Sequence, residues 1–228
     1  MAVRFSEDFA GVPLGQAATL TNTSFSSLVG TGTLLGVAGT FGRAVRMDTD
    51  GTAATFGGLR YEVGATAPTA RFYRGYVTPR RLPNAGAGHM FFTARAGGTI
   101  SGSVRILDTG FMHLRNGATN QTAAGQITTA AVGVGELVRV EYTQDTVALT
   151  HTARIFRGAG VHGTTPTETL TAPLTTAGTS FTIGSPFDIN AAMDFEQIVA
   201  EDAAFPTPLA APVVPETAYV LETWGAAT

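Results

Sequence analysis

Residues 135–158, GELVRVEYTQDTVALTHTARIFRG, hold the pattern that decides the fold. From Glu136 to Tyr142 the side chains point to two sides in turn, and a period of two predicts a β-strand. One side holds Glu136, Val138, Val140 and Tyr142, and the other holds Leu137, Arg139 and Glu141. A short polar turn is expected at Gln144–Asp145. Beyond it Val147, Leu149, Ala153 and Ile155 would share an apolar face that also holds His151. Two long antiparallel strands of this kind form a hairpin that packs one face against a second sheet.

The composition fits a chain covered in strands and turns. Only 14% of the 228 residues are charged, against the usual quarter, so much of the surface consists of Thr, Ser, Gly, Ala and Asn. Such a surface suits a chain held in an assembly. All 14 basic residues are arginine, as GC-rich codons favour, and a guanidinium is a planar fork suited to carboxylates.

Charge and cysteine count exclude several classes of protein. The net charge is −3 with no basic patch, so we expect no nucleic-acid partner. The chain has no cysteine, which excludes disulfides and thiolate-bound metals. Its N-terminus has no apolar stretch after a basic one, and no window approaches the length of a membrane helix. The sequence therefore predicts a protein made in the cytoplasm, without a cleaved signal peptide or a membrane partner.

Short strands recur every 8 to 12 residues or so, with turn residues between them, which is typical of a sandwich or barrel. Asp108–Gly110 has the spacing of a three-residue hairpin loop, and 79–88 reads as a long loop carrying Arg80 and Arg81. The window 191–202 fits either a helix face or an alternating strand. Further strands are expected at 3–9, within 24–37, and at 41–47, 56–63, 70–77, 89–95, 104–107, 111–115, 165–174 and 180–184.

The composition changes after Phe205. Four prolines between Pro206 and Pro215 predict an extended linker, so we divide the chain into a sandwich domain, 1–205, and a proline-rich linker with a C-terminal arm, 206–228. Tyr219, Leu221 and Trp224 follow as apolar anchors. We expect them to bind a neighbouring subunit; packing on the sandwich of the same chain is the alternative.

Several segments in this order resemble a concanavalin A-like, laminin-G-type jelly roll over roughly Val3 to Pro208. The resemblance implies an all-β fold of two antiparallel sheets in a sandwich, and it implies that Met193 to Glu201 is a late strand. The segments that carry it are 39–63, 71–94, DTGFMHLR at 108–115, ELVRVE at 136–141, IGS at 183–185 and MDFEQIVAED at 193–202.

The chain also resembles surface proteins of tailed-bacteriophage virions, such as minor tail and capsid decoration proteins of phages with GC-rich hosts. That resemblance implies a non-enzymatic structural protein of the virion, on the capsid or the tail. Its partners would be other virion proteins, further copies of itself, and host cell-surface glycans. The alternative function is a carbohydrate-binding module for host adhesion, and a glycoside hydrolase is the third candidate.

Catalysis is not expected. Glucanases of this fold carry the pattern Glu-x-Asp-x-x-Glu on one strand, which places two carboxylates at the distance for retaining hydrolysis. This sequence lacks that pattern. Asp194 and Glu196 are the nearest candidates, and we interpret them as the solvated outer face of an edge strand. No nucleophile elbow and no phosphate-binding loop occur.

No metal or other cofactor is expected either. Asp48 and Asp50 before Gly51 are the best candidates for calcium, but two carboxylates before a glycine are also typical of a turn. The four histidines lack the spacing of metal ligands, and His151 reads as a core histidine.

A sugar-binding site is the remaining possibility. Aromatic platforms and polar loop groups make such sites, and the chain offers several of each. The candidate glycan contacts are Tyr73, Tyr76, Arg80, Arg81 and Asn84, with Tyr61, Asn116 and Asn120 as further possibilities.

Overall fold

A computed structural model describes residues 3–30, 32–50, 57–62, 70–116, 123–184 and 189–202. Those residues form two antiparallel sheets packed face to face, with one short 3-10 helix, η1 (Gly158–Gly160), and no α-helix among them. The predicted all-β, two-sheet jelly-roll sandwich is confirmed. No helix in the described part of the chain is long and apolar enough to cross a membrane. The predicted C-terminal arm, with Tyr219, Leu221 and Trp224, lies outside the described residues.

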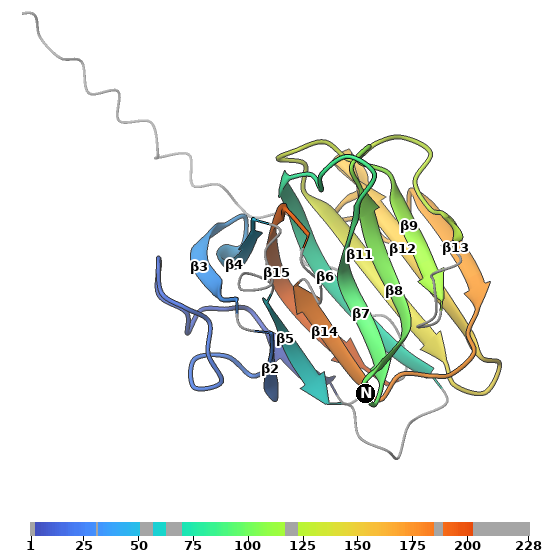
Figure 1. Ribbon diagram of the computed structural model, residues 1–228, viewed down its shortest axis with the longest axis horizontal. Coiled ribbons are helices and arrows are strands. Elements are labelled where there is room, and N and C mark those ends of the chain that lie inside the picture. Colours follow the sequence, from blue (N-terminus) through green and yellow to red (C-terminus); the bar gives the residue numbers. More distant parts are fainter. Residues whose placement is uncertain are drawn as a thin grey trace, which may run out of the picture.

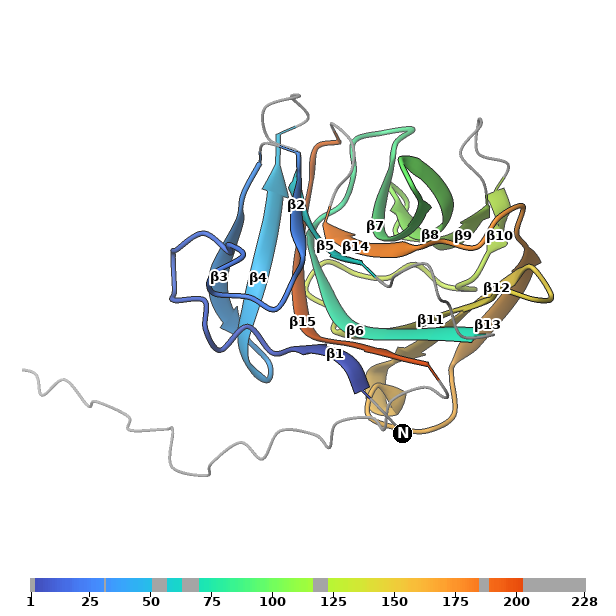
Figure 2. The same ribbon diagram turned by 90° about the horizontal axis from the view of Figure 1, so that it is seen from below.

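The first sheet, sheet A, contains the hairpin that opened the sequence analysis. Its strands in spatial order are β13 (Glu168–Pro173), β12 (Thr150–Arg157), β11 (Val138–Asp145), β6 (Ala70–Arg81), β15 (Ala191–Glu201), β4 (Gly42–Thr49) and β3 (Leu34–Gly39), with β1 (Val3–Glu7) paired to β15. Sheet A bends strongly: in Figure 2, β3 and β4 rise steeply from the plane of β6 and β11 and stand beside β2 and β5.

The second sheet, sheet B, lies in front of sheet A in Figure 1. Its strands in spatial order are β10 (Ala123–Gln126), β9 (Met112–Asn116), β8 (Thr99–Leu107), β7 (Gly88–Ala96), β14 (Ser180–Gly184), β5 (Gly57–Glu62) and β2 (Ser27–Gly30). Segments far apart in the sequence therefore lie side by side, because β14 is inserted between β5 and β7.

The core fills the space between the two sheets with aromatic and branched side chains. Tyr73 of sheet A stacks on Phe181 of sheet B with ring centroids 4.1 Å apart and an interplanar angle of 7°. Phe181 also meets Phe92 edge to face at 5.2 Å. Such aromatic pairs add to the stabilisation that burial of their area supplies. One continuous core thus joins both sheets.

The predicted hairpin is present, but its turn was placed wrongly. Strand β11 continues through Asp145, and the turn occupies 146–149. The Asp145 carboxylate accepts hydrogen bonds from the amides of Val147 and Ala148 at 2.9 and 2.7 Å, which stabilises the later turn. Val147 is consequently 75% exposed and Leu149 39% exposed, so neither belongs to the apolar face.

Two other predicted features of strands also need correction. Strand β6 runs through Arg81, so Arg80 and Arg81 lie on a strand and not in the predicted loop. In β7 a bulge between Met90 and Phe92 turns both Phe91 and Phe92 into the core, whereas strict alternation along the predicted strand 89–95 would put Met90, Phe92 and Ala94 on the inward side.

The ambiguous window at 191–202 is a strand, as the family resemblance implied. It is not an edge strand, however, because β15 pairs with β6 on one side and β4 on the other. The hairpin loop at Asp108–Gly110 is confirmed: the Leu107 amide bonds the Phe111 carbonyl at 3.0 Å, and Gly110 takes the left-handed φ of 80°.

Candidate functional site

The outer face of sheet B carries an unusual set of charges. Its seven strands contain four arginines, Arg60, Arg95, Arg105 and Arg115, and a single acidic residue, Glu62. All four arginines alternate with core side chains, so they point away from sheet A. We call these four residues, with His113 and the hydroxyls described next, the arginine face.

A row of side chains in register crosses the middle of this face. The strand pairings align Arg60 with Thr182, Thr182 with Thr93, Thr93 with Ser103, and Ser103 with Arg115. Neighbouring strands lie about 4.8 Å apart, so the row spans about 19 Å from β5 to β9. Three hydroxyls therefore form a floor between two guanidinium groups.

The hydroxyls of this floor have no partner in the described protein. Thr93 and Ser103 are fully buried and Thr182 is 1% exposed, yet none of the three hydroxyl oxygens makes a hydrogen bond to another described residue. Buried polar groups in folded proteins are nearly always paired with protein, water or ligand. The three hydroxyls thus have unused donors and acceptors among the described residues, and a ligand would reach them only after the side chains above them move aside.

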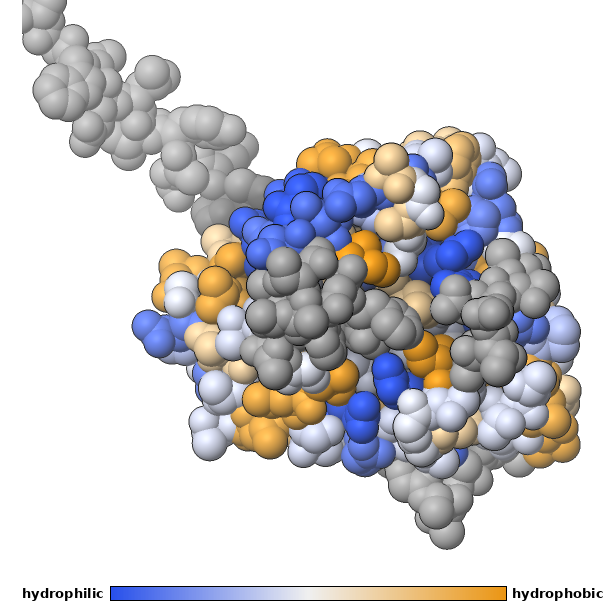
Figure 3. All heavy atoms as spheres, in the orientation of Figure 1, coloured by the Kyte–Doolittle hydropathy of each residue, from blue (hydrophilic) through white to orange (hydrophobic). Residues whose placement is uncertain are grey.

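A pocket adjoins one end of the row. It has a volume of about 260 Å³ and is lined by Gly86, Ala87, Gly88, Met90, Arg105, Arg115 and Ile189. The bulge in β7 brings Met90 to this side, directly opposite Arg105, and Arg105 in turn faces His113 on β9. Figure 3 views the molecule onto this side and shows hydrophilic side chains set between hydrophobic ones across its middle.

Burial, and to a smaller extent repulsion between neighbouring cations, lowers the pKa values of basic groups on the arginine face. Burial and the neighbouring Arg105 lower the pKa of Arg115 to about 10. Burial also lowers the pKa of Arg95, with Arg60 adding to the effect. The imidazole of His113 has a lowered pKa for the same two reasons, burial and then Arg105. The face therefore concentrates positive charge that Glu62 balances weakly, at 3.7 Å from Arg60.

Sheet A treats its arginines differently. Arg46 and Arg80 both bind the buried carboxylate of Asp194, with Nε–O distances of 2.6 and 2.7 Å. Arg139 lies 3.4 Å from Glu141 and stacks over the ring of Phe156 at 3.6 Å. Arg46, Arg80 and Arg139 are thus matched by carboxylates or a ring, whereas Arg71 on β6 is 2% exposed and two of its guanidinium nitrogens have no hydrogen-bond partner among the described residues.

Asp194 and Glu196, the nearest candidates for a catalytic pair, are both engaged in contacts within the fold. Asp194 is 1% exposed and Glu196 is 2% exposed, so the interpretation of a solvated outer face is wrong. Glu196 accepts a hydrogen bond from the Phe41 amide at 2.8 Å, and burial raises its pKa. Both carboxylates are used to hold β15 to neighbouring segments.

The calcium candidates take other roles where the structure describes them. Asp48 lies on β4 and binds the guanidinium of Arg81 at 2.6 Å. No group of three or more metal-binding side chains occurs within the described ranges. His151 is a core histidine, as predicted: its Nδ1 lies 3.1 Å from the Tyr142 hydroxyl, and burial lowers its pKa to about 4. Burial likewise lowers the pKa of His89 to about 4.

The predicted glycan contacts are not brought together. Tyr73 is buried between the sheets, and Tyr76 is buried on the opposite side of β6 against Phe41. Arg80 and Arg81 are exposed but occupied by Asp194 and Asp48, and Asn84 is exposed in the following loop. The arginine face was missed. The signal for it was present, since Arg95, Arg105, His113 and Arg115 alternate with apolar residues in segments that contain no acid.

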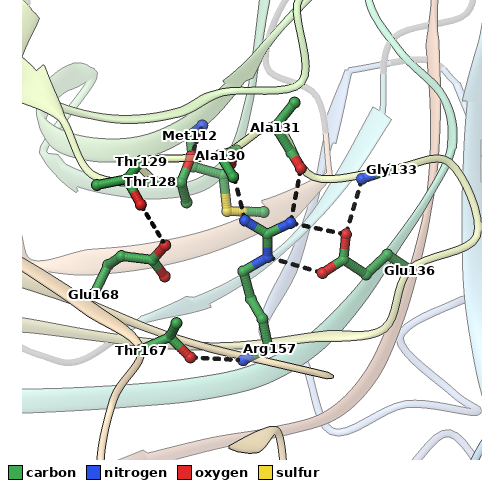
Figure 4. Close-up of polar contacts among 10 residues, drawn as sticks. All are labelled: Met112, Thr128, Thr129, Ala130, Ala131, Gly133, Glu136, Arg157, Thr167 and Glu168. Carbon is green, nitrogen blue, oxygen red and sulfur yellow. Dashed lines mark hydrogen bonds and ion pairs between the residues drawn. The ribbon is translucent and has the colours of Figure 1, made fainter. Parts of the chain in front are cut away.

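A second polar cluster, centred on Arg157, is structural (Figure 4). Its guanidinium donates to both oxygens of Glu136 at 2.8 and 3.0 Å and to the carbonyls of Ala130 and Ala131 at 2.9 and 2.7 Å. The carboxylate of Glu136 also accepts the Gly133 amide at 2.9 Å. The four acceptor atoms of the Arg157 guanidinium come from three residues in the connection between β10 and β11, so this cluster fastens the crossover from sheet B to sheet A.

Comparison with known proteins identifies solved structures of the same fold but no protein family for this chain. No protein-family model matches the sequence, and no curated protein is detectably similar to it. Several solved structures share the sandwich. Domain 4 of the extracellular arabinanase AbnA from Geobacillus stearothermophilus, solved with arabinotriose, superposes with a TM-score of 0.54 at 17% identity, covering 86% of this chain and 91% of that one.

Two further structures superpose equally well. The polysaccharide lyase family 7 alginate lyase AlgAT5 gives a TM-score of 0.56 at 10% identity, covering 87% of this chain and 94% of the lyase. The binding domain of Paraclostridial Mosquitocidal Protein 1 gives 0.56 at 12% identity, covering 90% of this chain and 50% of that one. At such identities the likeness establishes a shared jelly-roll sandwich alone.

Proposed function

We propose that this chain is a carbohydrate-binding module and that the arginine face of sheet B is its binding surface. The observation that carries the proposal is the row from Arg60 to Arg115, with three buried hydroxyls that have no partner in the described protein. A sugar chain presents hydroxyls along its whole length, each able to donate and to accept. A linear row of matching groups suits an extended oligosaccharide better than a compact ligand.

Analogy of fold supports the same proposal. Among the solved structures with this sandwich are a domain bound to arabinotriose and an alginate lyase. Function resides in sites rather than folds, so these structures serve as analogy, and the site residues supply the argument.

We propose further that binding occurs without catalysis. Glycoside hydrolysis ordinarily needs two carboxylates across the sugar-binding surface. The described strands of sheet B supply a single acid, Glu62 at the end of β5, and sheet A uses Asp194 in ion pairs and Glu196 in a backbone hydrogen bond. The predicted virion location stays a prediction from sequence resemblance. A glycan-binding module would fit a particle that adheres to its host.

A glycan array, followed by titration calorimetry of the best ligands, tests the proposal. The triple variant Thr93→Val, Ser103→Ala, Thr182→Val removes the floor hydroxyls while keeping the shape of the side chains, and we expect it to lose at least tenfold in affinity. Thr152→Val on β12 of sheet A is the matched control, since its hydroxyl bonds Thr171 on that sheet at 2.8 Å. Failure to bind any glycan, or unchanged binding by the triple variant, would overturn the proposal.

A further inference from the structure

We propose, on the basis of the carbohydrate-binding function above, that the ligand is an acidic glycan whose carboxylate or sulfate groups are bound by Arg60, Arg95, Arg105 and Arg115. The inference rests on the charge of the arginine face, its geometry, and the kinds of side chain that it lacks.

The arginine face carries more positive than negative side chains. Four of the 14 arginines of the chain lie on the strands of sheet B, and all four point outward with one acid among them. In sheet A, by contrast, Asp194, Asp48 and Glu141 neutralise neighbouring arginines. Among the described residues, six arginines of sheet A thus lie within ion-pair distance of a carboxylate, whereas on the arginine face Arg60 alone does, through Glu62.

The arginines form two pairs along the hydroxyl row: Arg60 and Arg95 on β5 and β7, and Arg105 and Arg115 on β8 and β9. Arg60 on β5 and Arg95 on β7 lie on the two strands that flank β14, and Arg60 adds to the burial that lowers the pKa of Arg95. Arg105 and Arg115 lie on the adjacent strands β8 and β9, and Arg105 adds to the burial that lowers the pKa of Arg115. Acidic groups spaced along a sugar chain would meet two cationic pairs along the row.

Each of the four guanidinium groups has at least one donor that is not used within the described protein. The Nε atoms of Arg60, Arg95 and Arg105 and one terminal nitrogen of Arg115 are buried without a hydrogen-bond partner in the described residues. A guanidinium has five N–H donors in a fixed fork, which matches the two oxygens of a carboxylate or sulfate. Like charges held together cost free energy, and a bound anion would remove that cost.

The missing side chains exclude the main alternatives. Among the outward-facing residues of the described strands of sheet B there is no Phe, Tyr or Trp, because Phe91, Phe92 and Phe181 lie in the core and Tyr61 packs against it. Neutral sugars and unpaired nucleic-acid bases both rely on aromatic platforms, and base stacking supplies much of single-strand affinity. A surface of guanidinium and hydroxyl groups instead fits a ligand that is both hydroxylated and anionic.

The experiment compares polymers that share a backbone and differ in charge. Affinity electrophoresis and calorimetry would use polygalacturonate against its fully methyl-esterified form, and dextran sulfate against dextran. We expect binding to polygalacturonate or dextran sulfate, with at least tenfold weaker binding to the neutral partner and a marked loss between 50 and 200 mM salt. The two acidic arms distinguish carboxylate from sulfate.

The matched variants are Arg105→Gln with Arg115→Gln for one pair, Arg60→Gln with Arg95→Gln for the other, and Arg43→Gln on β4 of sheet A as control. Each double variant should lose at least tenfold in affinity for the acidic polymer, and the control should bind like the parent chain. Because the removed charges repel each other, we expect the melting temperature of Arg105→Gln with Arg115→Gln to stay equal or rise. If Arg105 and Arg115 instead stabilised the fold, the double substitution would lower the melting temperature.

Different experimental results would refute the acidic ligand, the assigned arginines and the carbohydrate-binding function. Equal binding to the charged and neutral polymers, or binding to neutral glycans alone, overturns the acidic ligand and leaves the carbohydrate-binding function in place. Acidic binding that survives both double variants overturns the assignment to these arginines. No binding to any glycan overturns both proposals, and binding of single-stranded DNA in preference to every glycan does the same.

Discussion

The Arg157 cluster allows a stability prediction that can be worked from its contacts. The guanidinium fastens the connection between β10 and β11 through four hydrogen bonds, two to Glu136 and two to backbone carbonyls. Arg157→Gln removes the charge and the fork but keeps part of the stem. We expect the folded domain to persist with a lower free energy of unfolding.

The size of the effect follows from burial. The side chains of Arg157 and Glu136 are 14% and 28% exposed, so the pair is more shielded than a surface ion pair worth about 0.2–1 kcal/mol. Hydrogen bonds to charged groups contribute about 1.5–3 kcal/mol each, but water can replace part of them here. We therefore expect a loss of about 2 kcal/mol, which lowers the melting temperature of a chain this long by about 4–8 °C. Arg157→Lys should lose about half as much, because an ammonium cannot span all four acceptors.

The assay is thermal unfolding followed by circular dichroism at several pH values, with Arg43→Gln as control. Arg157 holds the pKa of Glu136 below its ordinary value of 4.5. A carboxylate with a lowered pKa stabilises the fold above its ordinary pKa, and that contribution disappears as the pH falls through the lowered value. The difference between the parent chain and Arg157→Gln should therefore shrink below about pH 4.5. A variant that melts within 1 °C of the parent at pH 7 would refute the reasoning.

Three further predictions follow from the core and the chain ends. Burial lowers the pKa values of His89 and His151 to about 4, so both imidazoles should stay neutral in NMR titrations between pH 5.5 and 8. The domain should lose stability as the pH falls from 6.5 towards 4, because the unfolded state binds those protons first. A titration midpoint near pH 6.5 for either histidine would contradict their burial. Gly102→Ala should cost about 1–3 kcal/mol in denaturant unfolding, because a Cβ there would collide with the hydrogen-bonded Tyr142 hydroxyl and His151 ring; an unchanged midpoint would show that the sheets can separate. Removal of 213–228 should leave the melting temperature within about 2 °C, since every described strand ends by Glu201; a larger loss would favour packing of the arm on its own sandwich over the predicted subunit contact.

Much of the fold could be predicted from local pattern. The strand Ser180–Gly184 has the predicted bounds, and the loop Asp108–Gly110 has the predicted length and a left-handed glycine. These features depend on side-chain alternation and on the backbone freedom of glycine, both of which a short segment expresses by itself. For the one ambiguous window, 191–202, the resemblance implied a strand from Met193 to Glu201, and the structure confirms it as β15.

Tertiary structure decided which face of each strand became a site. Alternation separates Tyr73 from Tyr76, but it does not say that one enters the core and the other is covered on the far side of sheet A. The bulge that turns Met90 outward arises from pairing between β7 and β8 and has no signature in a single strand.

The arginine face shows the same division. The sequence by itself determined that Arg95, Arg105 and Arg115 lie on strands opposite apolar neighbours, within segments that hold no acid. Only the pairing of β5, β14, β7, β8 and β9 placed Arg60 and Thr182, 122 positions apart in the numbering, in one row with them. The physical reason is that strand order and register are set by burial of both sheets against each other, a long-range free energy that no local period contains.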